Sequence, residues 1–447
     1  MMTLAAAGLG ILIIGVGLAL SIALHEIGHL VPAKLFGVKV TQYMIGFGPT
    51  VLSRRRGETE YGIKAVPLGG YIRMIGMYPP HKGDPEGTVR EDSTGFLQQM
   101  AQEAKEHEAS QYDSGDAHRT FVALSVPKKL VVMLGGPTMN LLISILLMVV
   151  MVSGVGMPAV TPTVGSVSEC VLPADAPADA SCEGQPEAPA LAAGILPGDV
   201  LREIDGHSIK TWDDVTSAVR AAGDRSIEVV VDRDGQLLTL EAEPIVDARP
   251  VLDEDGAAVF AEDGTLVTEE VGFLGVAGTP DLVRQSPAQV PEMAWDAFTR
   301  TGSMVLSLPV RLVEVAQAAF GPQERDPNGP LGVVGVTRLA GEIASADQPG
   351  FELREKTGTM ISVLASLNMA LFVFNLVPLL PLDGGHVGGA LLEGARRALA
   401  RLRGKPDPGP VDISRMLPVT NVVALAFLAM TLLLLYADIV APIRLFP

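Results

Sequence analysis

The sequence predicts a polytopic α-helical membrane protein with four transmembrane helices, a membrane-associated β-hairpin region and one extracytoplasmic α+β domain. Hydrophobic residues make up 48% of the 447 residues and charged residues only 19%, a balance that favours membrane insertion. Four apolar runs are each long enough to cross about 30 Å of hydrocarbon at 1.5 Å per residue. They cover residues 4–24, 130–157, 359–382 and 419–440.

The charges are divided unevenly along the chain, which has a net charge of −18. Residues 158–356 hold 34 acidic and 13 basic residues, whereas the remainder holds 17 acidic and 20 basic residues. Because short basic flanks of membrane spans stay cytoplasmic, we expect residues 31–129 and 384–418 inside. The acidic central segment and both termini are then outside. The negative charge of the central segment argues against nucleic-acid binding.

These observations divide the chain into eight parts. In order, they are transmembrane helix 1 (1–30), a cytoplasmic and membrane-associated β-region with a polar helical insertion (31–129), transmembrane helix 2 (130–157), an extracytoplasmic α+β domain (158–245), an extracytoplasmic region with amphipathic helices (246–358), transmembrane helix 3 (359–383), a cytoplasmic loop (384–418) and transmembrane helix 4 (419–441).

Residues 38–78 predict a β-hairpin, because short β-rich runs flank a polar turn at Arg56-Gly57-Glu58. Their many apolar positions indicate a location against the bilayer. The polar insertion follows at residues 81–120.

The outer domain shows alternating helix and strand signals. "TWDDVTSAVRAA" predicts an amphipathic helix, and "SIEVVVDRDGQLLTLEAEP" predicts a hairpin that turns at Asp234-Gly235. We expect one apolar helix face to carry Trp212, Val215 and Val219.

Two further features of the outer segment bear on its fold. Cys170 and Cys182 can form a disulfide in an oxidising compartment, and two free thiols are an equally open alternative. The stretch "AWDAFTRTGSMVLSLPVRLVEVAQAAFG" is amphipathic, and its charges and Pro309 favour an interfacial helix over a membrane span.

His25-Glu26-Ile27-Gly28-His29 forms an H-E-x-x-H motif at the end of the first apolar run. Residues i and i+4 share one helix face, so both imidazoles can reach one metal ion. The pattern is typical of zinc sites in which the glutamate is the general base. Ionisable residues inside a membrane are costly and mark functional sites, whereas either histidine alone would be explained as a structural residue. We therefore expect one Zn²⁺ on His25 and His29, with Glu26 as the catalytic base.

Zinc needs a third protein ligand. Residues 30–60 contain no His or Asp, and their glutamates lie in a polar turn. Asp383, in "NLVPLLPLDGGHVGG", ends the third apolar run at the depth where the motif ends the first. We therefore expect Asp383 as the third ligand, and His386, beyond the Gly-Gly pair, as its competitor.

Taken together, the motifs resemble those of the site-2 proteases, which are intramembrane zinc metalloproteases. The chain has H-E-x-x-H in the first run and "NLVPLLPLDGG" in the third, and its outer "AAGILPGDVLREIDG" is similar to a circularly permuted bacterial PDZ domain. "GFGP", "VPLGGYIRMIGM" and "GGPTMN" match as well. Nearly the whole chain resembles the regulator-of-sigma-E protease type in its single-PDZ, actinobacterial form; the insertion and the cysteine loop depart from it.

The resemblance implies roles for individual residues. It supports His25, His29 and Asp383 as zinc ligands and Glu26 as the base, and it implies that Asn375 holds substrate or stabilises the oxyanion. It further implies that the β-hairpin adds a strand to an unwound substrate and that the PDZ domain excludes substrates with bulky outer domains.

The resemblance also implies a setting: a zinc metalloendopeptidase in the bacterial inner (cytoplasmic) membrane, with the PDZ domain and both termini extracytoplasmic and the active site near the cytoplasmic face. Its partners would be the lipid bilayer and single-span membrane substrates, such as anti-sigma factors or signal-peptide remnants. An upstream site-1 protease would cut these substrates first, in regulated proteolysis that serves stress signalling.

Two other function classes fit parts of the sequence. A non-catalytic PDZ-bearing membrane scaffold would carry an inert motif and bind no zinc. A proton or metal transporter would use His25, Glu26 and Asp383 as a relay, but the sequence lacks the internal repeats that many transporters show.

Overall fold

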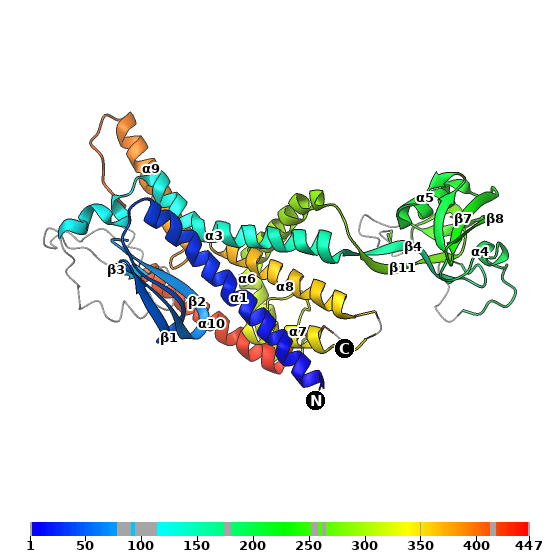
Figure 1. The fold of residues 1–447 in the computed structure, drawn as a ribbon, viewed down its shortest axis with the longest axis horizontal. Coiled ribbons are helices and arrows are strands. Elements are labelled where there is room, and N and C mark those ends of the chain that lie inside the picture. The colour runs from blue at the N-terminus through cyan, green and yellow to red at the C-terminus, as the bar shows by residue number, and fades with distance from the viewer. Residues whose placement is uncertain are drawn as a thin grey trace. The chain divides into compact units, whose positions relative to one another are not determined.

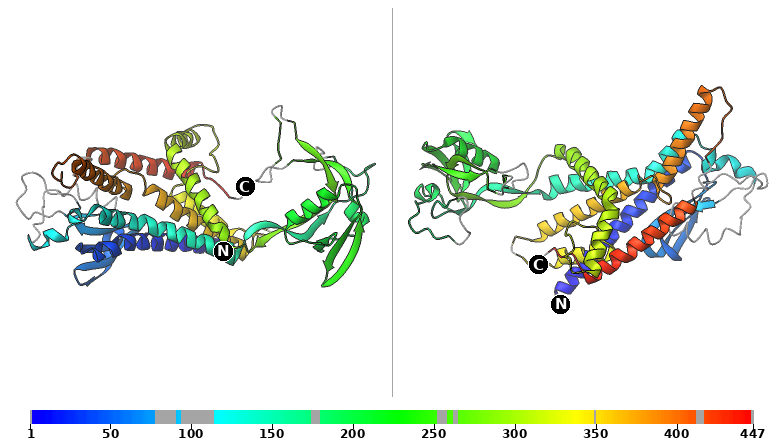
Figure 2. Two further views of the ribbon diagram at one scale, coloured as in Figure 1. Left: turned by 90° about the horizontal axis from the view of Figure 1, so that it is seen from above. Right: turned by 180° about the vertical axis from the view of Figure 1, so that it is seen from behind.

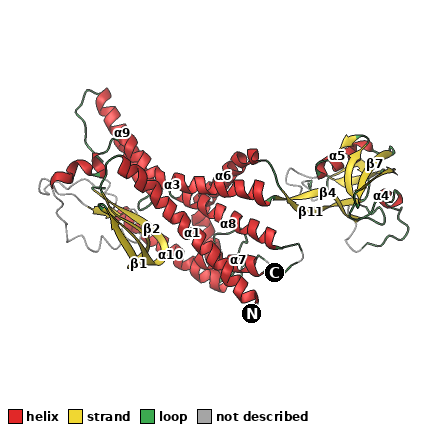
Figure 3. Ribbon diagram, viewed as in Figure 1, coloured by secondary structure: helices red, strands yellow, loops and turns green. Residues whose placement is uncertain are grey.

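The computed structural model describes the chain in two compact units. We call residues Met1–Val155 with Ser286–Pro447 the helical unit, and residues Gly156–Gln285 the β-rich unit. Figures 1 and 3 show helices in the first and mainly strands in the second. The described residues are 2–77, 91–93, 114–173, 180–251, 258–261, 265–348, 350–411 and 417–445.

The helical unit is built from long helices rich in Leu, Val, Ile and Ala. Those described are α1 (Met2–Leu35), α3 (Val126–Val149), α6 (Val290–Phe320), α7 (Val333–Ser345), α8 (Leu353–Phe374), α9 (Asp383–Leu402) and α10 (Leu417–Val440). A π-helical segment, η3 (Val150–Val155), extends α3, and short 3₁₀ turns form η1 (Ser114–Arg119), η2 (Phe121–Ala123) and η4 (Pro287–Gln289).

Helix α3 is the central element of this unit. It packs against α1, α8 and α9, and Figure 2 shows α1 and α3 side by side. Ser144 of α3 donates a hydrogen bond to the carbonyl of Ala365 in α8 at 2.9 Å. Asn368 of α8 donates to the Ser21 hydroxyl of α1 at 3.0 Å. The hydroxyl of Ser144 and the amide nitrogen of Asn368 therefore find acceptors on the neighbouring helices, as an apolar surrounding favours.

Five described helices are long and apolar enough to cross a membrane: Leu4–Leu35, Val126–Val155, Pro287–Phe320, Leu353–Phe374 and Pro418–Val440. The candidate that we did not expect to span the membrane is α6, which we predicted as an interfacial helix. Its charged residues lie toward its two ends and leave residues 301–310 uncharged. The expected count of four transmembrane helices is therefore not confirmed.

Two of the differences between the expected and the observed helix boundaries lie close to the site. Helix α1 continues past residue 30 to Leu35, so the H-E-x-x-H motif is followed by further helical turns. Helix α8 ends at Phe374 rather than at Asp383, and Pro378 and Pro381, which disfavour helix, lie in the turn that follows it.

A further difference concerns the segment expected as the cytoplasmic loop 384–418. About half of it is helix α9, which begins at Asp383. The glycines early in this helix disfavour a helix prediction there, although strong helix formers follow in "ALLEGARRALARL". The expected transmembrane helix 359–383 is therefore the end of one helix, a proline-containing turn and the first residue of another helix.

The predicted hairpin is present as β1 (Val40–Arg56) and β2 (Thr59–Ile75), which pair antiparallel across a turn at Gly57. Both strands bend, so residues 42–45 face residues 60–63 on one side and residues 70–73 on the other. Strand β3 (Glu91–Ser93) pairs with β2. The remainder of the insertion expected at 81–120 lies largely outside the described residues.

The sheet packs on the C-terminal half of α1. The buried cluster there is formed by Leu30, Ala33, Val38, Val40, Tyr43, Ile72, Met74, Met77, Phe121, Val132 and Met133. The Tyr43 hydroxyl donates to the carbonyl of Ala23 at 2.8 Å. These contacts place β2 beside the H-E-x-x-H segment.

The β-rich unit has one main sheet in the order β11-β4-β5-β7-β8. Its elements are β4 (Met157–Val167), α4 (Pro189–Ala192), β5 (Val200–Ile204), β6 (His207–Ser208), α5 (Trp212–Ala222), β7 (Ile227–Arg233), β8 (Gln236–Ala242), β9 (Ile245–Pro250), β10 (Thr268–Phe273) and β11 (Val276–Val283). The unit therefore extends to residue 285, beyond the expected end at 245.

Local signals in this unit match the structure. Helix α5 starts at a capping box between Thr211 and Asp214, and Val215 and Val219 face the core with Trp212 packed beside them. The hairpin turns where expected, with Arg233 opposite Gln236. Of the two alternatives for the cysteines, the structure has the disulfide between Cys170 and Cys182.

Candidate metal centre

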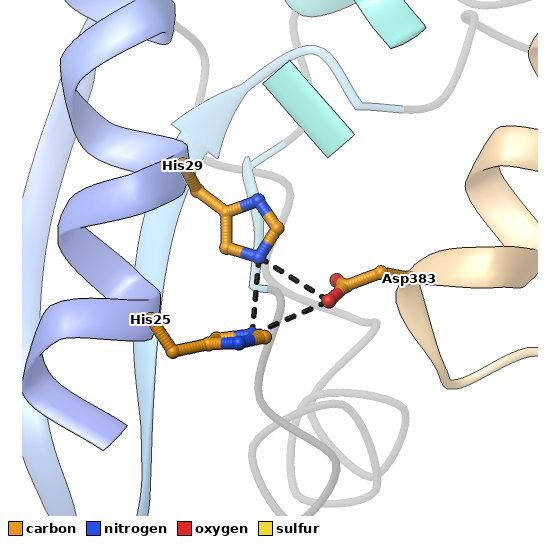
Figure 4. Close-up of side chains that lie close together, drawn as sticks. All are labelled: His25, His29 and Asp383. Carbon is orange, nitrogen blue, oxygen red and sulfur yellow. Dashed lines mark hydrogen bonds and ion pairs between the residues drawn. The ribbon is translucent and has the colours of Figure 1, made fainter. Parts of the chain in front are cut away.

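Three ligand-type side chains converge in the helical unit. His25 and His29 project from one face of α1, and Asp383, the first residue of α9, points toward both (Figure 4). Nε2 of His25 lies 3.2 Å from Nε2 of His29, and Oδ2 of Asp383 lies 3.3 Å from each nitrogen. The structure thus brings together the three ligands expected from the sequence.

Nε2 of His25, Nε2 of His29 and Oδ2 of Asp383 form a triangle that has the dimensions of a zinc ligand set. Bonds of about 2.0–2.1 Å in tetrahedral directions place neighbouring ligand atoms about 3.3 Å apart, which is the edge length found here. Three atoms that each offer a lone pair at this distance need a cation or a proton between them. The residues present therefore fit a bound zinc ion.

Helix α3 contacts the other nitrogen of each imidazole. Nδ1 of His29 lies 2.8 Å from the carbonyl oxygen of Val132, an acceptor, so Nδ1 carries the proton and Nε2 has the lone pair. Nδ1 of His25 lies 3.1 Å from the side-chain amide of Asn140. We did not expect Asn140 at the site; its only sequence signal was its position at the end of "GGPTMN".

Glycines allow α1 and α3 to approach this closely. A Cβ on Gly135 would collide with the carbonyl oxygen of Gly28, and one on Gly28 would collide with the carbonyl of Gly135. A Cβ on Gly136 would collide with the His29 ring. The glycine pair in "GGPTMN" therefore makes the room that the second histidine occupies.

Asp383 reaches the histidines because the chain turns sharply before it. Gly384 and Gly385 lie against the backbone of Val377 and Leu380, where Cβ atoms would clash. Asp383 is 5% exposed and its Oδ2 lies at equal distances from the two imidazoles, so an ionised carboxylate there is placed to share a cation with them.

Glu26 is buried beside the triangle, with 5% of its surface exposed. Its side chain lies against Gly70 of β2, where a Cβ would come within 2.9 Å of the Glu26 Cγ. Burial and the charge of Glu26 raise the pKa of Tyr43 to about 12, so this neighbouring phenol stays neutral.

The remaining two expected residues are placed differently. Asn375 caps the end of α8 and is half-buried, and its side chain makes no hydrogen bond within the described part of the chain. His386, the competing ligand, is buried in α9, where burial lowers its pKa to about 4. It is not among the three residues whose ligand atoms converge.

The sequence matches known proteins along most of its length. Residues 13–406 match the model of a family described as Peptidase family M50. The chain is 32% identical over 450 residues to the zinc metalloprotease Rip1 of Mycobacterium tuberculosis, with 98% of each chain covered. It is 31% identical over 458 residues to Rip1 of Mycolicibacterium smegmatis, covering 98% of this chain and 99% of that one.

A more distant relative is the zinc metalloprotease RasP of Geobacillus kaustophilus, 24% identical over 419 residues that cover 83% of this chain and 86% of the relative. The family model spans both the H-E-x-x-H segment and the helix that begins with Asp383. The chain therefore belongs to Peptidase family M50.

Proposed function

We propose that the chain is an intramembrane zinc metalloprotease that cleaves single-span membrane proteins near the cytoplasmic face. The observation that carries this function is the triangle of His25, His29 and Asp383, with Glu26 buried next to it on a helix apolar enough to span a membrane. Membership of Peptidase family M50 and the zinc metalloprotease relatives support it.

His25, His29 and Asp383 would hold the zinc ion. When bound, zinc supplies Lewis acidity, which makes water a stronger acid near neutral pH and polarises a carbonyl group. The carboxylate also offsets part of the metal charge in this buried setting.

Glu26 acts as the proton carrier. Its carboxylate accepts a proton from the attacking water, whose oxygen forms a bond with the carbonyl carbon of the scissile peptide. As the C–N bond breaks, Glu26 returns that proton to the leaving nitrogen. Burial among β2 and α1 keeps the carboxylate in one position and limits competing water.

Asn375 is proposed to contact the substrate. It lies in the turn that leads from α8 to Asp383, and its side-chain amide makes no hydrogen bond with other described residues. Its amide is thus available as a donor to the carbonyl oxygen that becomes negative during the reaction.

The bent sheet of β1 and β2 is proposed to receive the substrate as an extended strand. A helical peptide bond is shielded by its own hydrogen bonds, so the substrate helix must unwind before hydrolysis. Gly70 of β2 lies directly against Glu26, so this part of the sheet is next to the proposed base. Strand addition would hold the peptide by main-chain hydrogen bonds.

The topology follows from the charged flanks. Basic residues next to the spans favour a cytoplasmic position for the β1–β2 sheet, with the β-rich unit and both termini outside the bacterial inner membrane. We propose that the β-rich unit is a PDZ domain that filters substrates by size. Anti-sigma factors and signal-peptide remnants, already trimmed outside by another protease, are the proposed substrates.

A Glu26→Gln variant tests this function. Purified variant and wild type would be incubated in detergent with a single-span anti-sigma factor whose outer domain has been removed. We expect both to bind one zinc per chain, whereas the variant cleaves at least about 100-fold more slowly, the lower part of the range for general acid–base catalysis. Glu314→Gln, at an exposed carboxylate of α6, is the matched control and keeps full activity.

The same measurements separate the alternatives. An inert scaffold would contain no zinc, and a transporter would move ions across vesicles without cutting the substrate. Unchanged cleavage by the Glu26→Gln protein would contradict the assignment of Glu26.

A further inference from the structure

We propose that Asn140 is a positioning residue that holds His25 in its metal-binding tautomer by accepting the His25 Nδ1–H with its amide oxygen. This inference rests on the proposed zinc site. Asn140 lies on α3 and is 1% exposed, and its amide is 3.1 Å from Nδ1 of His25. It contacts the nitrogen that faces away from Asp383.

The tautomer follows from the geometry of the triangle. Nε2 of His25 lies 3.2 Å from Nε2 of His29 and 3.3 Å from Oδ2 of Asp383, so Nε2 must offer a lone pair to a metal. A neutral imidazole has one lone pair and one N–H. Nδ1 must therefore carry the hydrogen, and it needs an acceptor.

Only one atom of the Asn140 amide can be that acceptor. In the structure Nδ2 is the amide atom nearest to Nδ1, and Oδ1 is buried without a hydrogen-bond partner among the described residues. A half turn of the amide exchanges the two atoms with almost no change in shape. In the exchanged orientation Oδ1 accepts the His25 Nδ1–H, and the buried oxygen is satisfied.

The same helix serves both histidines in this arrangement. Val132 offers its main-chain carbonyl to Nδ1 of His29 at 2.8 Å, and Asn140 offers its side-chain carbonyl to Nδ1 of His25. Acceptors of this kind fix the ring orientation and the tautomer of a ligand, and their removal commonly weakens metal binding about 10–100-fold. The Val132 acceptor belongs to the backbone, so Asn140 is the one that side-chain substitution can remove.

Two substitutions of nearly equal size separate the acceptor role from packing. Asn140→Asp keeps an oxygen at the same place and removes the donor, whereas Asn140→Leu removes both. Ser144→Ala is the matched control, because Ser144 lies one turn further along α3, is equally buried and bonds the carbonyl of Ala365 rather than a histidine.

The experiment measures zinc affinity of the full chain in detergent by competition with a chelator. We expect about 10–100-fold weaker binding for Asn140→Leu, and binding close to wild type for Asn140→Asp and Ser144→Ala. Cobalt substituted for zinc reports coordination by its visible absorption, which Asn140→Asp should preserve and Asn140→Leu should alter. Asn140→Ala, which also removes the acceptor, replaces the leucine variant where that protein does not fold.

Three results would overturn the inference. Equal losses in the Asp and Leu variants would mean that the amide acts as a donor or through its neutral shape. Unchanged zinc affinity in the Leu variant would mean that His25 needs no side-chain acceptor. A wild-type protein that binds no zinc would overturn the proposed function and this inference with it, whereas tight wild-type binding confines a failure to Asn140.

Discussion

Lys129 and Glu393 form a buried ion pair between α3 and α9, with Nζ of Lys129 at 2.8 Å and 3.0 Å from the two carboxylate oxygens. Each side chain is only 4% exposed, and Arg397 adds a second cation 3.1 Å from Glu393. Buried charges are costly unless they are paired, so such a pair favours one alignment of the two helices. It ties the helix that begins with Asp383 to the helix that contacts both histidines.

Breaking this pair should destabilise the fold and the metal site together. Lys129→Met leaves the Glu393 carboxylate with Arg397 and a long hydrogen bond from the Val411 amide at 3.4 Å. We expect a loss of about 3 kcal/mol, the lower end for breaking a buried ion pair. Zinc affinity should fall as well, because α9 is released. Thermal unfolding in one detergent and a zinc titration measure both effects.

The double variant Lys129→Met/Glu393→Leu is the control for that prediction. Replacing both charges by apolar groups is often neutral for stability, so it should recover most of the loss. A single variant as stable as wild type would show that the pair does not fix the two helices.

The contact between Gly28 and Gly135 predicts a strong effect of one added methyl group. Gly135→Ala forces α1 and α3 apart, and we expect about 1–3 kcal/mol of destabilisation from overpacking, together with weaker zinc binding. Gly15→Ala is the control on α1, since open space surrounds that glycine. Unfolding midpoints and zinc content distinguish the two variants, and equal behaviour of both would refute the close contact.

The identity of the third ligand can be tested by two substitutions in α9. Asp383→Asn removes the negative charge and the ionised oxygen, and we expect zinc affinity to fall by more than about 100-fold, the upper end for loss of an outer-shell partner. His386→Asn should leave zinc affinity nearly unchanged, because His386 is not part of the triangle. The opposite pattern in a chelator titration would make His386 the ligand.

The β-rich unit has its own pH-dependent element in Asp199 and Arg233. Hydrogen bonds from Arg233 at 2.7 Å and 2.8 Å hold the pKa of Asp199 below its usual range. A depressed carboxyl pKa stabilises the fold above the unfolded value of about 3.9, and this contribution is lost as the pH falls through the folded value.

Asp199→Asn should therefore cost about 2 kcal/mol at neutral pH, the range for hydrogen bonds to charged groups, and progressively less below about pH 4. The chain has two tryptophans, so a Trp295→Phe background leaves Trp212 of this unit as the fluorescent reporter of unfolding. A cost that is independent of pH would mean that the charge of Asp199 is not responsible.

Patterns within short segments could be predicted from the sequence. The spacing of His25 and His29 places both on one helix face, and the Asp234-Gly235 turn and the apolar face of α5 follow from local periodicity. Asp383 could be paired with the motif from its expected depth and its "PLDGG" setting, although it begins α9 instead of ending the third apolar helix.

Contacts between distant segments could not be predicted in this way. Asn140 meets His25 because glycines set the distance between α1 and α3, and that distance has no periodic signal. Lys129 and Glu393 are 264 residues apart, and each alone has the sequence character of an ordinary flanking charge. The start of α9 could not be predicted either, because its first residues include several glycines, which have low helix propensity.

The order of synthesis has a consequence for when activity can begin. His29 and Asp383 are 354 residues apart, and the whole β-rich unit lies between them. A ribosome therefore releases both histidines and Glu26 long before the residue that closes the triangle. Through most of translation the nascent chain therefore lacks one of the three converging residues, and the complete set first exists after residue 383 has been made.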